Sequence, residues 1–196
     1  MLKASKQILD DLPQLQSFIN GRLLNGLKRV EDAQLLFGSG TGNNLHGIYT
    51  QATAYSAPIT IASPTRVDTM RLAMLQAALA DVFATGHVLH MHDWTAIELL
   101  KDTTGAYLFT NPFSPNTPSL WGLPVAETNH AAMASKFLTG SFAEAAQIFD
   151  REDANVVIST ENADDFEKNM ISVRCEERLA LAVYRPEAFV KGEFPA

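Results

Sequence analysis

The stretch KNMISVRCEERLALAVYRP, residues 168–186, decides how the rest of the chain is interpreted. Apolar side chains recur in it at every second position, with one interruption, at Val173, Cys175, Leu179, Leu181 and Val183. A period of two is typical of a β-strand with one apolar face. The sequence therefore predicts a long strand over 170–183.

Four charged residues in the middle of this strand need an explanation: Arg174, Glu176, Glu177 and Arg178. Buried on both faces of a sheet, such charges would be costly unless they were paired. On a strand whose second face meets neighbouring subunits, they become lateral contacts. We therefore predict that these four residues form an interface.

The bulk composition indicates a globular chain with enough apolar content for a core. Its 196 residues are 46% hydrophobic and 19% charged, which is unlike a disordered protein. The net charge of −7 argues against a nucleic-acid-binding surface, which needs clustered Lys and Arg. The single Cys175 excludes an internal disulfide. The sequence has no run of apolar residues long enough to span a membrane and no signal peptide, so we expect a protein of the reducing cytoplasm.

Upstream of this strand the pattern predicts a mixed α+β fold. A helix is expected from about Leu12 to Phe37, after the start signal at Asp10–Pro13 and before Gly38, with an apolar stripe at Leu12, Leu15, Ile19, Leu23, Leu27 and Val30. A second helix is expected over 65–84, with Leu72, Leu75, Leu79, Val82 and Phe83 facing inward, and a short third one over 93–101. Strands are expected over 88–91, 107–109, 123–126, 136–139, 145–150, 154–160 and 188–192.

Three sequence features could indicate chemistry, and their context argues against each. The glycine-rich run 38–42 follows a helix instead of a strand, so it lacks the setting of a phosphate loop. His87, His90 and His92 could hold zinc, but alternation along a strand places His87 opposite the other two, and Asp93 is expected to cap the next helix. No nucleophile elbow accompanies the serines. We therefore predict no cofactor and no metal site.

The chain also resembles a known family. The segments GSGTGNN (38–44), TAY (53–55), DW (93–94), ELLKD (98–102), WGLPV (121–125) and IFDRED (148–153), together with the last strands, are similar in order and spacing to the major capsid proteins of tailed phages of the Hong Kong 97 type. The similarity covers roughly residues 30–194.

The resemblance implies a fold, a function and a set of partners. It implies a long spine helix, a peripheral domain made of 1–38 and 148–179, and an axial domain made of 39–147 and 180–196. It implies a structural, non-enzymatic subunit of a phage or prophage head that assembles into pentamers and hexamers. The implied partners are copies of itself and the scaffold, protease and portal proteins of the same phage, in the host cytoplasm and then the virion. An encapsulin-like shell, a minor head or decoration protein and a small-molecule hydrolase using the histidines remain alternatives.

Two residues match positions with a chemical role in the family. In its type member, the asparagine at the place of Asn169 is attacked by a lysine amine of a neighbouring subunit, and the glutamate at the place of Glu176 is the base. Seven residues of strand span about 23 Å, so the two could act only across interfaces. The donor lysine lies on a hairpin before the spine helix, and neither Lys3, Lys6 nor Lys28 matches it. We therefore expect a chain shortened at its N-terminus that does not crosslink itself and is a soluble monomer or small oligomer.

Overall fold

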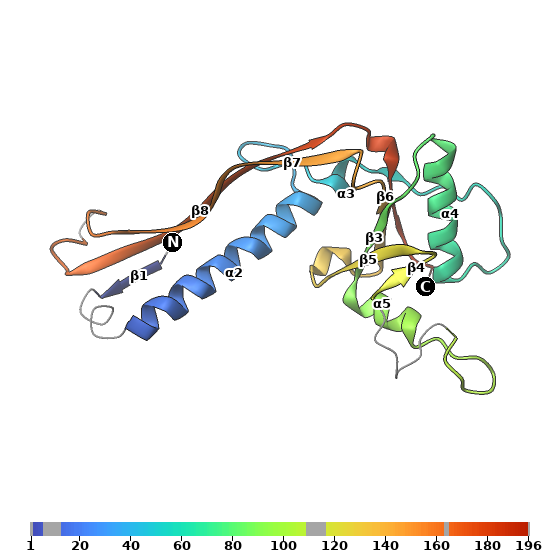
Figure 1. The fold of residues 1–196 in the computed structure, drawn as a ribbon, viewed down its shortest axis with the longest axis horizontal. Coiled ribbons are helices and arrows are strands. Elements are labelled where there is room, and N and C mark those ends of the chain that lie inside the picture. Colours follow the sequence, from blue (N-terminus) through green and yellow to red (C-terminus); the bar gives the residue numbers. More distant parts are fainter. Residues whose placement is uncertain (1, 6–12, 109–116, 163–164, 196) are drawn as a thin grey trace.

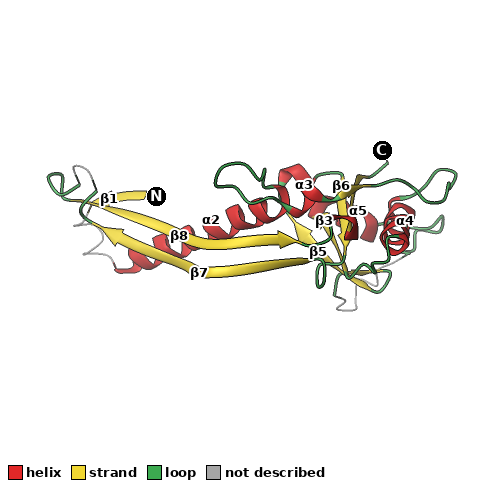
Figure 2. Ribbon diagram, turned by 90° about the horizontal axis from the view of Figure 1, so that it is seen from above, coloured by secondary structure: helices red, strands yellow, loops and turns green. Residues whose placement is uncertain are grey.

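A computed structural model describes residues 2–5, 13–108, 117–162 and 165–195. It divides into a long half and a compact half (Figure 1). The long half comprises β1 (Leu2–Ser5), α2 (Pro13–Phe37), β7 (Ala146–Ser159) and β8 (Met170–Val183). Figure 2 shows α2 running beside the ribbon of β7 and β8, with β1 next to β8. The predicted α+β class is confirmed.

The predicted strand over 170–183 is confirmed as β8, the central strand of the order β1-β8-β7. Both neighbours are antiparallel, and two irregularities in β7, between Asp150 and Asn155, each shift its register against β8 by one residue. The two segments expected at 145–150 and 154–160 are therefore one continuous strand. Ile171 and Val173 of β8 are buried against Ile19 and Leu23 of α2. This contact holds the helix on the sheet.

The predicted spine helix is confirmed in its extent, because α2 begins at Pro13 and ends at Phe37. Proline suits the first turn of a helix, where its missing N–H costs nothing. The expected start at 10–12 lies outside the described residues, as does the side chain of Leu15 in the stripe. Val30 is 57% exposed, so the inward orientation expected for it is wrong. Val30 is exposed because it lies outside the small core that Ile19 and Leu23 of α2 form with β8.

The compact half is built on a six-stranded sheet of order β2-β9-β6-β3-β5-β4. Its strands are β2 (Thr53–Ala54), β3 (Gly86–His90), β4 (Ser119–Leu120), β5 (Leu123–Thr128), β6 (Lys136–Gly140) and β9 (Phe189–Glu193). One face packs on α4 (Arg66–Leu79) and α5 (Met91–Glu98), through Leu89, Phe137 and Val190. The other face packs on the end of α2, α3 (Ile48–Gln51) and the 3-10 helix η1 (Ala131–Met133). A second 3-10 helix, η2 (Pro186–Ala188), precedes β9.

Helix α4 begins as predicted and ends earlier than predicted. Thr65 forms a capping box with Asp68, in which each side chain binds the other residue's backbone N–H. The helix ends at Leu79 instead of Ala84, because Asp81 adopts a φ of +58° and turns Val82 into the core. Leu79 and Phe83 are 70% and 81% exposed, so the prediction that they face inward is wrong.

Two further elements differ from the expectation. Helix α5 begins at Met91, with His90 as its cap, so Asp93 lies inside the first turn and is not the cap. The strand expected over 107–109 is absent from the described residues, where Tyr107 forms one isolated bridge with Lys101; Phe109 lies outside them.

Candidate assembly interface

The predicted interface residues do not all share one face of β8. Alternation places Arg174, Glu176 and Arg178 on the face turned away from α2, and we call these three residues the charged face. Arg174 and Glu176 form an ion pair of 2.8 Å, with side chains 60% and 38% exposed. A surface pair of this kind contributes little to folding stability, roughly 0 to 1 kcal/mol. The charged face is therefore not explained by the stability of the single chain.

Glu177 points the other way, toward α2. Burial, followed by the negative charge of Glu177, raises the pKa of the Glu31 carboxyl on α2, and Asp32 and Asp150 add to the effect. Lys28 acts in the opposite direction. Glu177 thus belongs to an acidic group between the helix and the sheet of its own chain.

Exposed apolar side chains accompany the charged face. Phe149 pairs with Ala180, and Val157 pairs with Arg174, which places both on the same side of the sheet. They are 47% and 40% exposed. A mixture of half-exposed apolar and charged side chains on a flat ribbon is typical of a protein–protein interface.

Asn169 and Glu176 lie at separate points along the long half. Asn169 is exposed and adopts a φ of +52° in the turn before β8, a conformation that asparagine tolerates better than most residues. Glu176 lies in the middle of the strand, opposite Asn155 of β7. Seven residues of strand correspond to about 23 Å, so one chain does not bring the two together.

An ion pair that sequence reasoning missed fixes the end of the sheet near Asn169. The Lys3 Nζ of β1 lies 2.6 Å from Oδ1 of Asp165, a carboxylate that is 1% exposed. The hydrogen bond from Lys3, followed by the one from Ser172, holds the pKa of Asp165 below its usual range. The Lys3 side chain is therefore engaged in an ion pair within its own chain.

The histidines have separate structural positions. His87 is buried, with Nδ1 3.0 Å from Oγ1 of Thr139. His90 Nδ1 accepts from the backbone N–H of His92 at the start of α5. Within the described ranges, no group of three or more His, Cys, Asp or Glu side chains is placed to hold a metal ion. The His87–Thr139 pair has the spacing of a base and a nucleophile, but both residues are buried, 1% and 0% exposed, away from substrate.

Burial of His87 makes the stability of the fold dependent on pH. Desolvation lowers the His87 pKa from 6.5 to about 4, and the carbonyl of Leu120 offsets part of this effect. The unfolded chain then binds a proton at a pH where the folded chain does not, so stability falls as pH decreases from 6.5 toward 4. We expect the free energy of unfolding to decrease by roughly 2 kcal/mol between pH 7 and pH 5. Urea denaturation at both pH values measures it, and His87→Gln should remove most of the difference. An unchanged pH dependence in that variant would contradict the assignment to His87.

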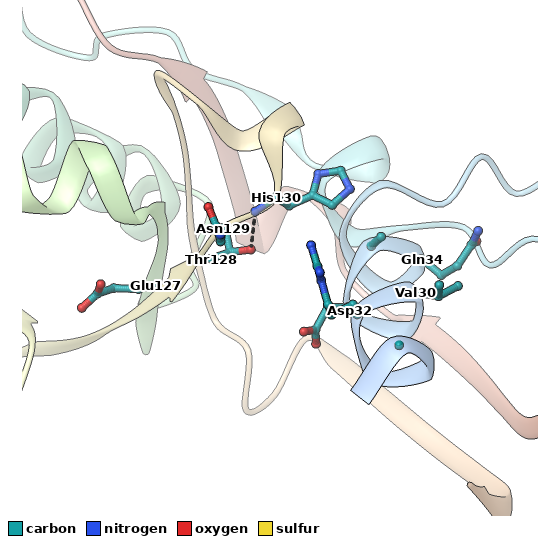
Figure 3. A pocket seen from close by; sticks show the side chains of 10 residues that line it. Val30, Asp32, Gln34, Glu127, Thr128, Asn129 and His130 are labelled. Carbon is teal, nitrogen blue, oxygen red and sulfur yellow. Dashed lines mark hydrogen bonds between the residues drawn. The ribbon is translucent and has the colours of Figure 1, made fainter. Parts of the chain in front are cut away.

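A cleft lies between α2 and the end of β5 with the residues that follow it (Figure 3). Its volume is about 640 Å³, and its polar lining includes Arg29 and Asp32 on one side and Glu127 and His130 on the other. The His130 ring stacks on Phe37, with centroids 5.0 Å apart, and its Nδ1 accepts from the N–H of Ala132. The Thr128 hydroxyl in this cleft accepts from the backbone N–H of His130, so it serves the turn after β5.

The sequence of the chain is similar to those of known capsid proteins. The family model described as the phage capsid family matches residues 1–194. The chain is 47% identical over 193 residues to the major capsid protein of Enterobacteria phage HK97. That match covers 98% of this chain and 50% of the relative, so the chain spans about half the relative's length.

Solved structures show the same fold. The capsid of an empty GTA particle matches with a TM-score of 0.74 at 21% identity, covering 100% of this chain and 72% of the other. A structure from Gordonia phage Cozz matches with a TM-score of 0.75 at 16% identity, covering 100% and 68%.

Proposed function

The chain belongs to the phage capsid family, and on this premise we propose that it is a structural subunit of the icosahedral head of a tailed phage or prophage. In this role it associates with copies of itself into pentamers and hexamers and carries out no catalysis. The observation that supports the proposal most strongly is the 47% identity to a major capsid protein over nearly the whole chain.

The long half and the compact half of the molecule correspond roughly to two proposed domains. We propose that residues 1–38 and 148–179 act as the peripheral domain and that residues 39–147 and 180–196 act as the axial domain. The long half, with α2 beside β7 and β8, suits the periphery because it offers an extended ribbon to neighbours (Figure 2). The compact half has its own core and suits the centre of a ring.

The proposed partners follow from the same role. They are copies of this chain first, and then the scaffold, protease and portal proteins of the same phage. The proposed locations are the virion and, before assembly, the cytoplasm of the bacterial host. Among the helices described, none has the length and apolarity to cross a membrane.

Reversing one charge on the charged face tests the proposed role. We expect the wild-type chain to form concentration-dependent oligomers of up to six copies, measured by native mass spectrometry. Arg174→Glu should weaken this association about tenfold or more, because it places like charges at a contact between copies. Its thermal midpoint should stay within about 2 °C, because the exposed pair adds little to folding.

Arg22→Glu is the matched control, since Arg22 is an exposed arginine on α2. It should associate like the wild type. A wild-type chain that stays monomeric at every concentration, with no trapping by chemical crosslinkers, would refute the self-association proposal.

We further propose that Asn169 and Glu176 serve as contact residues between copies of this chain and do not form a covalent link when the chain is alone. Lys3 is held by Asp165, and Glu176 is held by Arg174. Oligomers from the same experiment should therefore run as one band on denaturing gels. A covalent ladder that Asn169→Ala abolishes would show that the acceptor chemistry operates.

A further inference from the structure

The turn between β4 and β5 places a bulky residue in an unfavourable conformation. Leu120 and Leu123 pair across a two-residue loop made of Trp121 and Gly122. Both loop residues have positive φ, 54° for Trp121 and 79° for Gly122. This is the geometry of a type I′ turn, in which Asn-Gly is preferred and a tryptophan at the first position is strained. Such strain is a sign of function when the chain itself gives no compensation.

Contacts within the chain do not compensate for this strain. The Trp121 side chain is 51% exposed. Its Nε1 lies 3.5 Å from the carbonyl oxygen of Val67, at the long limit of a hydrogen bond, and the Arg71 guanidinium lies 5.7 Å from its ring centre. A large, half-exposed aromatic side chain next to an arginine is the composition of an interface hot spot.

A cavity that could accept this side chain lies at the other end of β5. Its volume is about 400 Å³, and it is lined by the apolar Met91, Ala96 and Leu99 and by the polar His90, His92, Thr95 and Asn129. We call it the α5 socket. Met91 and Leu99 are 49% and 55% exposed, so the socket is an open apolar surface in the single chain.

The two features lie at opposite ends of one strand. Trp121 and Gly122 immediately precede Leu123, the first residue of β5, and Asn129 immediately follows Thr128, the last. Six residues of strand correspond to about 20 Å, and Figure 1 shows β4 and η1 at the two ends of β5. A contact between unlike surfaces of identical copies is heterologous, and it forms a ring when the rotation between successive copies closes.

We propose that Trp121 of one copy inserts into the α5 socket of the next copy and anchors the contact between compact halves around a ring. The inference rests on the proposed function, because it requires self-association. The bound species is a second copy of this chain, and the indole ring is the recognised group.

Replacing Trp121 by asparagine separates this role from a structural one. Trp121→Asn creates the preferred Asn-Gly turn, so the thermal midpoint of the monomer should rise by about 2 to 4 °C as the strain is removed. Association measured by sedimentation should weaken roughly 30-fold, the usual loss at a hot spot. A variant that loses thermal stability and association together, or that associates like the wild type, would overturn the proposal.

Disulfide trapping tests the socket directly. In a Cys175→Ser background, chains carrying Ser119→Cys, an exposed position beside the turn that leaves Trp121 in place, are mixed with chains carrying Thr95→Cys and oxidised. Disulfides between the two kinds of chain should form and appear as dimers on non-reducing gels. The control mixture uses Glu187→Cys, an exposed position on η2, in place of Thr95→Cys and should give few dimers.

The outcomes distinguish the two proposals. Equal dimers in both mixtures, or efficient dimers from Ser119→Cys chains alone, would overturn the socket while leaving the capsid role intact. No dimers from chains that associate as wild type would do the same. If no dimers form and the wild-type chain is itself monomeric, both the self-association proposal and the socket proposal would be overturned.

Discussion

Asp93→Ala should lower the free energy of unfolding by about 3 kcal/mol, because Asp93 is a buried charge with partners on two other segments. Its Oδ1 accepts from Arg66 Nη1 at 3.0 Å, and its Oδ2 accepts from the backbone N–H of Ser135 at 2.8 Å. Asp93 is 2% exposed and the Arg66 side chain 31%. Removing the carboxylate leaves the arginine and one backbone N–H without this acceptor, which is the costly case for a buried pair. Urea denaturation at pH 7 measures the loss.

Two comparisons make this prediction specific. Asp153→Ala removes an exposed aspartate of β7 and should change stability by less than about 0.5 kcal/mol. A double-mutant cycle with Arg66→Ala should give a coupling of at least about 1 kcal/mol. If Asp93→Ala matched the Asp153→Ala control, the network would not stabilise the fold.

Gly38→Ala should lower the free energy of unfolding by about 3 kcal/mol, since no space exists for a methyl group at this position. A Cβ there would lie 2.2 Å from the backbone oxygen of Leu45 and 2.6 Å from that of Gln34. The backbone of Gly47 passes next to Gly38, and its N–H donates to the Gly38 carbonyl at 3.0 Å. Backbone cannot move aside as a flexible side chain can, so the joint between α2 and the compact half must distort.

A glycine-to-alanine substitution inside the spine helix α2 should instead raise the free energy of unfolding. Gly21 lies inside α2 with no atom within 4 Å of its would-be Cβ. Gly21→Ala should therefore raise the free energy of unfolding by about 0.5 to 1 kcal/mol through helix propensity alone. Thermal denaturation of both variants provides the comparison, and a Gly38→Ala protein as stable as the wild type would show that the crossing tolerates displacement.

Local patterns were sufficient to predict the long elements. Helix α2 was predictable to its last residue because Gly38, a typical helix stop, directly follows Phe37. Strand β8 was predictable because apolar residues recur at every second position from Val173 to Val183, interrupted only at Glu177. The family followed from short motifs, and the match to residues 1–194 confirms it.

Features set by tertiary geometry were not predictable. The end of α4 depends on a positive φ at Asp81, within an alanine-rich run that by propensity would continue the helix. Alternation along β8 correctly predicts that Glu177 lies on the same face as the apolar side chains. It does not predict that Glu31 of α2 lies near enough for the two negative charges to interact. The strain at Trp121 has a weak sequence signal, a bulky residue followed by glycine between two strand segments, and needs coordinates to be recognised.

The exposure of strand β7 affects how rigid the long half of the single chain is. None of its 14 residues is buried, although β7 runs the length of the ribbon. A strand without a buried residue contributes little apolar free energy to its own subunit. The long half of the single chain should therefore be pliable, and in the head proposed above its stiffness would come from contacts with adjacent copies.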